Sequence, residues 1–434
     1  MKRAALVVAM LCLTLSVSVQ AENWPCWRGP RGDGSSVDQQ VPLTWNGETG
    51  KNILWKTAVP GDGHASPIIW NDRVFVVTCD QEKKERRLIS LDASTGKTVW
   101  SKVVLESLLE TKHNLNSYAS STPATDGKHV YVTFLEVDGS TIPAPNVGNS
   151  RPVTPGVITV AAYDFNGDRK WLVKPGEFIS AHGFCSSPVI HGDLLIVNGD
   201  HDGKSYIVAL NRYTGKTVWK IKRKYGIRSY VTPIIRKVAG KTQMFVPGSK
   251  HLACLDPKDG SEYWRVEGDL PEQYVASPCF DGNYFFMAAG FPTHHVIAVR
   301  PDGQGDVTES HVQWHTKDVR CYVPSPVLAG NALFVADDRG TASAFDTKTG
   351  EKIWKERMGR HYSASLIATK SHVFFVADDG ITKVVKAGEK PEIVEENPLG
   401  EFSFASPAIA NGRLFIRGEN SLYCIGYPKT AAVR

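Results

Sequence analysis

Aromatic and basic side chains recur at one kind of position along this sequence. They lie within seven residues before a proline that follows Ser or Thr, or before Leu366, which takes the place of that proline in one repeat. Their chemistry is that of a binding site, because arginine offers a planar fork to carboxylate or phosphate, histidine adds pH-dependent charge and tyrosine offers a stacking surface. The candidate residues are His64, Tyr118, His182, Arg228, Tyr230, Tyr274, Arg320, Tyr322, His361 and Tyr362, accompanied by Phe184, Arg360 and Phe402.

Two interpretations of this series stay open. The aromatic side chains could fill the end of a central channel, in which case Tyr→Ala changes would lower stability and leave binding untouched. The series could instead form a funnel for an anionic or aromatic ligand, or for a peptide segment of a protein partner. If the funnel binds an anion, replacing both Arg228 and Arg320 by Ala should abolish binding and barely move the melting temperature.

Other chemically suggestive patterns are weaker, and we expect no catalytic residue and no metal site. Asp164-Phe165-Asn166-Gly167-Asp168 has the first ligand positions of a calcium loop but lacks the downstream Gly and Glu. His294 and His295 are neighbours in a strand pattern, so they point to opposite faces and do not easily share a ligand. Asp200-His201-Asp202-Gly203 is typical of a hairpin turn.

Repeated strands must position the series of aromatic and basic candidate residues. Five segments carry an Asp or Asn, then a turn Gly, then a Trp four residues after that Gly, which predicts a tight turn followed by an outer strand. With the candidate Asp or Asn first, they are Asp92…Gly96…Trp100, Asp164…Gly167…Trp171, Asn211…Gly215…Trp219, Asp256…Gly260…Trp264 and Asp346…Gly350…Trp354.

Eight unit starts are spaced along the chain, at Pro67, Pro123, Pro188, Pro233, Pro278, Pro326, Leu366 and Pro407. Short apolar runs bounded by Asp, Asn and Gly lie between them, and no long helical period is present. The sequence therefore predicts an all-β fold, an eight-bladed β-propeller of four-stranded antiparallel blades. The last unit lacks a Trp strand, whereas residues 50–59 form a lone outer strand, so we expect the N-terminal strand to join the C-terminal blade and close the ring.

The repeat units resemble the tryptophan-docking repeats of the PQQ propeller superfamily, over about residues 23–427. Residues 24–34, 116–123 and 305–308 are similar to segments of bacterial secreted "PQQ-binding-like" propeller proteins. The superfamily holds both PQQ-dependent dehydrogenases and the assembly lipoprotein BamB, so the resemblance implies the fold and leaves two functions. The favoured one is a non-catalytic binding or scaffold propeller, BamB-like in role class; the alternative is a quinoprotein dehydrogenase that oxidises alcohols or sugars.

Departures from the dehydrogenase pattern favour the scaffold. The chain has no adjacent cysteine pair, no haem attachment motif and no residues that match the calcium ligands of those enzymes. We therefore expect no cofactor, with PQQ and Ca²⁺ as the alternative.

The N-terminus predicts export. Lys2 and Arg3 precede an apolar run with a small-residue cleavage site at Ala21, so residues 1–21 are expected to be a signal peptide and the mature chain a periplasmic or extracellular protein. No lipobox and no transmembrane anchor are expected. The expected organisation continues with an extension (22–49), the propeller (50–427) and a tail (428–434).

The charge balance of the sequence limits the classes of partner that are expected. The sequence has 50 Lys+Arg against 45 Asp+Glu, a balance that disfavours nucleic acid. We expect a protein partner or a small anionic ligand, and a monomer or a subunit of a complex.

The seven cysteines after the signal are scattered, which favours buried thiols over disulfides. The insertion 106–116 is expected to lengthen the approach to the second blade, and the insertion 139–156 is expected to be an extended, exposed loop.

Overall fold

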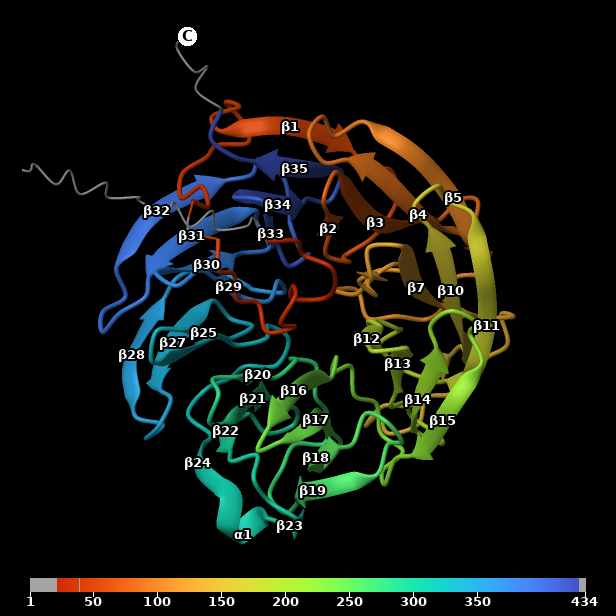
Figure 1. Ribbon diagram of the computed structural model, residues 1–434, viewed down its shortest axis with the longest axis vertical. Coiled ribbons are helices and arrows are strands. Elements are labelled where there is room, and N and C mark those ends of the chain that lie inside the picture. Colours follow the sequence, from red (N-terminus) through yellow and green to blue (C-terminus); the bar gives the residue numbers. More distant parts are fainter. Residues whose placement is uncertain (1–21, 39, 429–434) are drawn as a thin grey trace, which may run out of the picture.

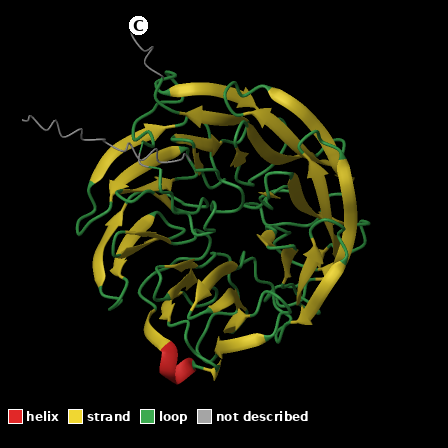
Figure 2. Ribbon diagram, viewed as in Figure 1, coloured by secondary structure: helices red, strands yellow, loops and turns green. Residues whose placement is uncertain are grey.

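The computed structural model describes residues 22–38 and 40–428, which form 35 strands and one short helix, α1 (Thr308–His311). Eight sheets are arranged around a central axis (Figure 1), and loops fill the space near that axis (Figure 2). The expected eight-bladed propeller is therefore confirmed. The signal peptide expected at residues 1–21 and residues 429–434 of the expected tail lie outside the described residues. Within the described ranges, no helix is long and apolar enough to cross a membrane.

Each blade has four antiparallel strands, and in blades 1 to 7 these follow one another in the chain from the axis outward. The first four blades are blade 1, β2 (Ile68–Trp70), β3 (Arg73–Asp80), β4 (Glu85–Asp92) and β5 (Thr98–Glu106); blade 2, β6 (Ala124–Thr125), β7 (His129–Glu136), β10 (Gly156–Asp164) and β11 (Arg169–Phe178); blade 3, β12 (Val189–His191), β13 (Leu194–Gly199), β14 (Tyr206–Asn211) and β15 (Thr217–Lys222); and blade 4, β16 (Ile234–Val238), β17 (Lys241–Gly248), β18 (His251–Leu255) and β19 (Glu262–Val266), to which β23 (Gly305–Asp306) adds in parallel.

The other four are blade 5, β20 (Cys279–Phe280), β21 (Phe285–Ala289), β22 (His295–Val299) and β24 (Val312–Thr316); blade 6, β25 (Val327–Ala329), β26 (Ala332–Ala336), β27 (Thr341–Asp346) and β28 (Lys352–Arg357); blade 7, β29 (Ile367–Ala368), β30 (His372–Val376), β31 (Ile381–Lys386) and β32 (Ile393–Pro398); and blade 8, β33 (Ala408–Ala410), β34 (Arg413–Arg417), β35 (Ser421–Ile425) and β1 (Ile53–Ala58).

Blade 8 takes its outer strand from the opposite end of the chain, as expected. Strand β1 pairs antiparallel with β35, and Trp55 lies opposite Cys424. Figure 1 shows the red β1 beside the blue β35 at the top of the ring. Without β1, the backbone edge of β35 would have no partner.

Tryptophans dock six of the eight outer strands onto the turn of the next blade. The indole Nε1 of Trp55 donates to the carbonyl of Ala93, and its ring covers Gly96, whose φ of 71° suits glycine. Asp92 caps the same turn by accepting from the amides of Ser94 and Thr95. The same docking recurs at Trp100, Trp171, Trp219, Trp314 and Trp354.

Two tryptophans depart from the repeat pattern. Trp314 docks on blade 6 although no Gly precedes it by four residues, so the sequence motif missed it. Trp264 has the motif, yet its indole donates to Oε1 of Gln243 within its own blade.

The Ser or Thr before each unit start links neighbouring blades near the axis. In each link the backbone amide of one such residue donates to the hydroxyl of its counterpart in the next blade, at 2.8–3.0 Å or 3.2 Å. The links found are Ser66 to Thr122, Thr122 to Ser187, Thr232 to Ser277, Ser277 to Ser325, Ser325 to Ser365 and Ser365 to Ser406. The proline that follows seven of these residues has no amide hydrogen, whereas Leu366 donates to the carbonyl of Ser325.

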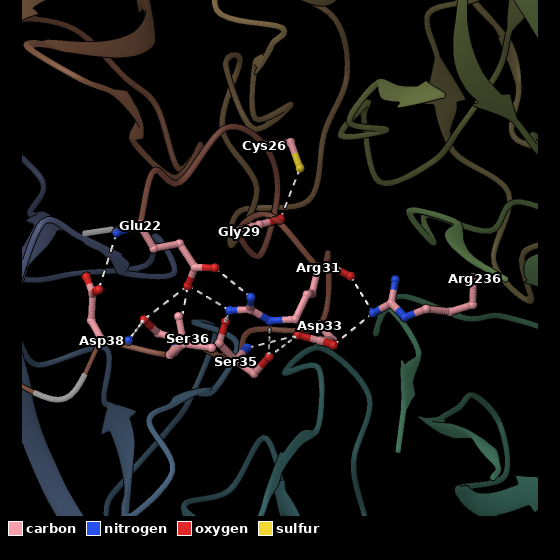
Figure 3. A network of polar contacts seen from close by, with 10 residues as sticks. Glu22, Cys26, Gly29, Arg31, Asp33, Ser35, Ser36, Asp38 and Arg236 are labelled. Atoms are coloured by element: carbon pink, nitrogen blue, oxygen red, sulfur yellow. Dashed lines mark hydrogen bonds and ion pairs between the residues drawn. The ribbon is translucent and has the colours of Figure 1, made fainter. Parts of the chain in front are cut away.

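The segment 22–38 crosses the ring at the ends of the inner strands. Trp24 exchanges backbone hydrogen bonds with Ile69 in blade 1, and Gly34 accepts from Ala368 in blade 7. Buried Arg28 donates to the carbonyls of Ser277 and Pro326, in blades 5 and 6. Figure 3 shows the polar network of this segment, in which Arg31 meets Glu22 and Asp33 meets Arg236. The extension is therefore packed against several blades.

Candidate functional site

The loops that lead into the inner strands all lie at one end of the ring. Because strand direction alternates within a blade, the hairpins between second and third strands lie at this same end. We call this end the mouth face. The opposite end carries the turns between third and fourth strands and is called the turn face. All ten candidate residues stand in the loops of the mouth face: His64, Tyr118, His182, Arg228, Tyr230, Tyr274, Arg320, Tyr322, His361 and Tyr362.

Only part of the series is in mutual contact. Nε of Arg228 lies 3.4 Å from Nδ1 of His182, whose ring is 6.2 Å from that of Tyr230. The amide of Tyr230 donates to the carbonyl of Tyr274. His64 instead stacks on Phe404, with ring centroids 4.7 Å apart. Tyr118 is also separate, beneath the cationic groups of Arg86 and Lys112.

Arg228 is not an open fork for a ligand, contrary to the sequence expectation. Its Nη1 contacts both carboxylate oxygens of Asp202, at 2.8 and 3.0 Å, and its side chain is 3% exposed. The same guanidinium donates to the carbonyl of Asn146, at the tip of the insertion 139–156. That insertion is more ordered than expected, since β8 (Ile142–Pro143) and β9 (Pro152–Val153) pair within it. The charge of Arg228 is already neutralised inside the protein.

Three of the five candidate tyrosines are core residues. Tyr230, Tyr274 and Tyr362 are buried, and burial raises their hydroxyl pKa. Among described residues, the hydroxyls of Tyr274 and Tyr362 find no hydrogen-bond partner. Tyr118 and Tyr322 keep exposed surface, and the hydroxyl of Tyr322 donates to Oε1 of Gln273 at 3.1 Å. Packing thus accounts for most of these rings.

Two of the three candidate histidines, His64 and His182, add little positive charge. Burial lowers the pKa of His64 to about 4 and that of His182 to about 3, so both are neutral at pH 7. Nδ1 of His361 lies 2.6 Å from Oδ2 of Asp378 and is held by that carboxylate.

Aspartates in the mouth-face hairpins fix the loops, although they are not among the residues predicted from the sequence. Oδ1 of Asp338 accepts from the amides of Tyr322 and Val323, at 3.3 and 3.0 Å. Oδ1 of Asp378 accepts from the amide of Ser363 at 2.7 Å. The signal was present, because blades 6 and 7 share Ala-Asp-Asp after their second strands, at 336–338 and 377–379. Burial raises the pKa of Asp338.

Exposed groups on the mouth face include apolar and cationic side chains as well as acidic ones such as Asp318 and Asp379. Phe291, Phe402 and Leu115 are 51%, 55% and 42% exposed, and the ring of Phe291 lies 6.2 Å from that of Tyr322. Arg320 is exposed as well.

A cavity opens between two neighbouring blades. It has a volume of about 710 Å³ and lies between blades 8 and 1, where His64, Phe404 and Arg417 line it together with Asp62 and Asp80. Of the ten candidate residues, only His64 contributes to it.

The described residues show neither the ligand cluster nor the adjacent cysteines expected of a PQQ–calcium site. In the ranges 22–38 and 40–428, no three His, Cys, Asp or Glu side chains come together as a metal site. The seven cysteines of the described chain are all unpaired, and no two are adjacent in sequence. Asp164 caps its own turn by accepting from the amides of Asn166 and Asp168, as the repeat requires.

The fold and the repeats define the class as a PQQ-like β-propeller. The family model described as "Outer membrane protein assembly factor BamB" matches residues 37–142, 135–356 and 338–426, so the chain belongs to that family. A curated relative, the outer membrane protein assembly factor BamB of Burkholderia pseudomallei (strain K96243), is 30% identical over 105 residues, which cover 22% of this chain and 25% of the relative. The match thus spans about a quarter of that relative's length.

Solved structures share the fold at low identity. BamB from Moraxella catarrhalis superposes with a TM-score of 0.59 at 14% identity, covering 87% of this chain and 99% of that one. The quinohemoprotein alcohol dehydrogenase ADHIIG from Pseudomonas putida HK5 has a TM-score of 0.61 at 11% identity, covering 95% and 81%. A computationally designed protein, Ika8, has a TM-score of 0.58 at 12% identity, covering 87% and 100%.

Proposed function

We propose that this protein is an exported, non-catalytic scaffold propeller that binds a protein partner through its mouth face, in the role class of BamB. The observation that carries the proposal is the division of the mouth-face residues. The ionisable groups nearest the axis are satisfied within the protein, as in Arg228–Asp202 and His361–Asp378. The exposed groups include Phe291, Phe402, Leu115 and Arg320.

This division favours a protein over a small anionic ligand. Small ligands bind in enclosed pockets, whereas protein interfaces are broad and enriched in exposed aromatic residues and arginine. The relative's name states a role in outer membrane protein assembly, and we propose a corresponding role for this chain in an extracytoplasmic complex. Export would depend on residues 1–21.

Photo-crosslinking in the native cells tests the proposal. A photoreactive amino acid placed at Phe402 or Leu115 should give a discrete protein adduct, because both positions are exposed on the mouth face. The matched control places it at Lys258 or Lys348, which are exposed on the turn face. Equal adducts from both faces, or none from the mouth face, would overturn the proposal.

The dehydrogenase alternative has its own measurement. Purified protein is incubated with PQQ and Ca²⁺ and examined for a bound quinone spectrum and dye-linked oxidation of alcohols or sugars. A scaffold should show neither, and a retained quinone with turnover would favour the alternative.

A further inference from the structure

Four arginines cluster on the mouth face at blade 6. Arg339 lies in the hairpin between β26 and β27, and Arg357 ends β28. Arg320 and Arg360 stand in the loops that lead into blades 6 and 7. All four side chains are exposed. The sequence pattern groups Arg320 with Arg228 of another blade, whereas the structure places Arg320 near three other arginines.

Backbone contacts establish that the four positions are close together. Thr341, two residues after Arg339, pairs with Arg357 across β27 and β28. The carbonyl of Gly340 accepts from the amides of Met358 and Gly359, at 2.8 and 3.0 Å, directly before Arg360.

The Arg320 loop joins the same hairpin. Asp338, the neighbour of Arg339, accepts from the backbone of Tyr322 and Val323. All four arginines are therefore within two residues of the hairpin 338–341 or of a backbone group bound to it.

Most of the carboxylates nearby are held by other donors: Asp318 pairs with Lys352, and the exposed Asp379 accepts from the amide of Ile381. Asp337 accepts from the amides of Arg339 and Thr341, which caps its own turn. Asp338 holds the Arg320 loop through its backbone, and Asp378 pairs with His361. Within the described residues, none of the four guanidinium groups makes an ion pair or a hydrogen bond.

The alternation of side chains along β28 places a further cation, Lys355, on the same face as Arg357. Arg357 and Lys355 are two residues apart in β28, so they share one face of the blade, and Glu356 points to the other. An exposed apolar group lies nearby, because Phe291 packs near Tyr322 in the Arg320 loop.

We infer that the cluster Arg320, Arg339, Arg357 and Arg360 is the docking surface for an acidic segment of the protein partner. Arginine suits carboxylates because its planar fork donates two parallel hydrogen bonds. A protein segment fits better than an anionic membrane, because the aspartates interleaved among the arginines reduce the averaged field that a membrane would sense. Phe291 and Tyr322 would receive an apolar side chain of the same segment. The inference rests on the proposed function and deepens it.

A fluorescein-labelled oligoglutamate peptide tests the charge preference of the mature protein. We expect binding that weakens as salt is raised, since exposed charges are screened. Replacing the four arginines by Glu should lower affinity by at least about tenfold, with the melting temperature nearly unchanged. Should that variant fail to fold, the four Arg→Gln changes replace it.

The control reverses the same number of charges on the turn face, in Lys97→Glu, Lys216→Glu, Lys258→Glu and Lys348→Glu, all exposed positions. This variant has the same net charge as the first and should keep the peptide affinity. Equal loss in both variants would show that only net charge matters and would overturn the inference. Binding to phosphatidylglycerol-containing vesicles without binding to the peptide would also overturn it.

The two proposals fail in different ways. If mouth-face crosslinks persist in the four-arginine variant and the peptide does not bind the unmodified protein, the acidic docking surface is wrong and the scaffold function stands. If the crosslinks themselves are missing from the unmodified protein, the proposed function fails first.

Discussion

At the scale of residues, two arginines of the mouth face have different environments. Arg228 and Arg320 occupy similar positions before their unit starts. Arg228 is 3% exposed and paired with Asp202, whereas Arg320 is exposed. The difference arises because the hairpin of blade 3 carries a carboxylate beneath Arg228.

This difference predicts different stability effects. Arg228→Ala should lower the free energy of unfolding by about 3–5 kcal/mol, because it leaves the buried Asp202 charge without a partner. Arg320→Ala should change it by less than about 0.5 kcal/mol. Chemical denaturation of both variants measures the contrast, and equal effects would contradict the buried pairing.

Buried histidines predict a loss of stability in mild acid. Burial lowers the pKa of His182 and His251 to about 3, below the ordinary value of 6.5. The unfolded chain therefore binds more protons between these values, so stability is complete above pH 6.5 and falls as the pH is lowered. Denaturation midpoints between pH 7 and pH 5 should show this slope.

The variant His182→Gln/His251→Gln isolates their contribution. Its slope should be shallower than that of the unmodified protein over the same range, because two of the groups that take up protons on unfolding are gone. An identical slope would show that other groups dominate. Asp92, with a pKa lowered to about 2, titrates below this window.

At the scale of elements, turn glycines such as Gly96 let the docking tryptophans pack closely against the turn. A Cβ at Gly96 would lie 2.6 Å from ring atoms of Trp55, whereas a Cβ at Gly240 would meet nothing within 4 Å. Both glycines have positive φ, 71° and 77°. The pair therefore separates backbone strain from inter-blade packing.

Gly96→Ala should be the more destabilising of the two changes. Both variants lose about 1 kcal/mol to the left-handed backbone, and Gly96→Ala should lose a further 1–3 kcal/mol or so because the Trp55 ring must move. Thermal unfolding with indole fluorescence as the signal measures this. Equal losses would mean that the Trp55 contact contributes nothing.

At the scale of the whole molecule, both ends of the chain meet in blade 8, and segment 22–38 ties several blades together. A variant lacking residues 22–49 keeps β1 and should remain an eight-bladed ring of lower stability, since the contacts of Trp24 and Arg28 are lost. A variant lacking residues 22–59 also loses β1 and Trp55. It should expose the edge of β35 and lose cooperative unfolding.

Limited proteolysis with mass spectrometry distinguishes the two deletions. Cleavage in the longer deletion should begin between residues 405 and 426, in the blade that has lost its outer strand. Unfolding of both variants at the temperature of the full mature chain would contradict closure as a source of stability.

Much of the architecture could be predicted because its signals are local. The Asp92–Gly96 turn, the strand runs and the four-residue step from Gly96 to Trp100 each lie within a few residues, so they are readable in one chain. The unmatched outer strand around Trp55 then implied closure by counting. Trp314 shows the limit, because its docking depends on a neighbouring blade and its own motif is absent.

The sequence by itself determined the number of blades, the closing strand and the end of the ring where the candidate residues gather. Only the tertiary structure decided which of those residues are available. Asp202 meets Arg228 and the 338–341 hairpin meets the Arg320 loop after the chain has returned through whole strands, so their distances depend on how the blades pack. Burial and charge pairing are properties of that packing, and a repeat pattern that fixes turns and strands carries no record of them.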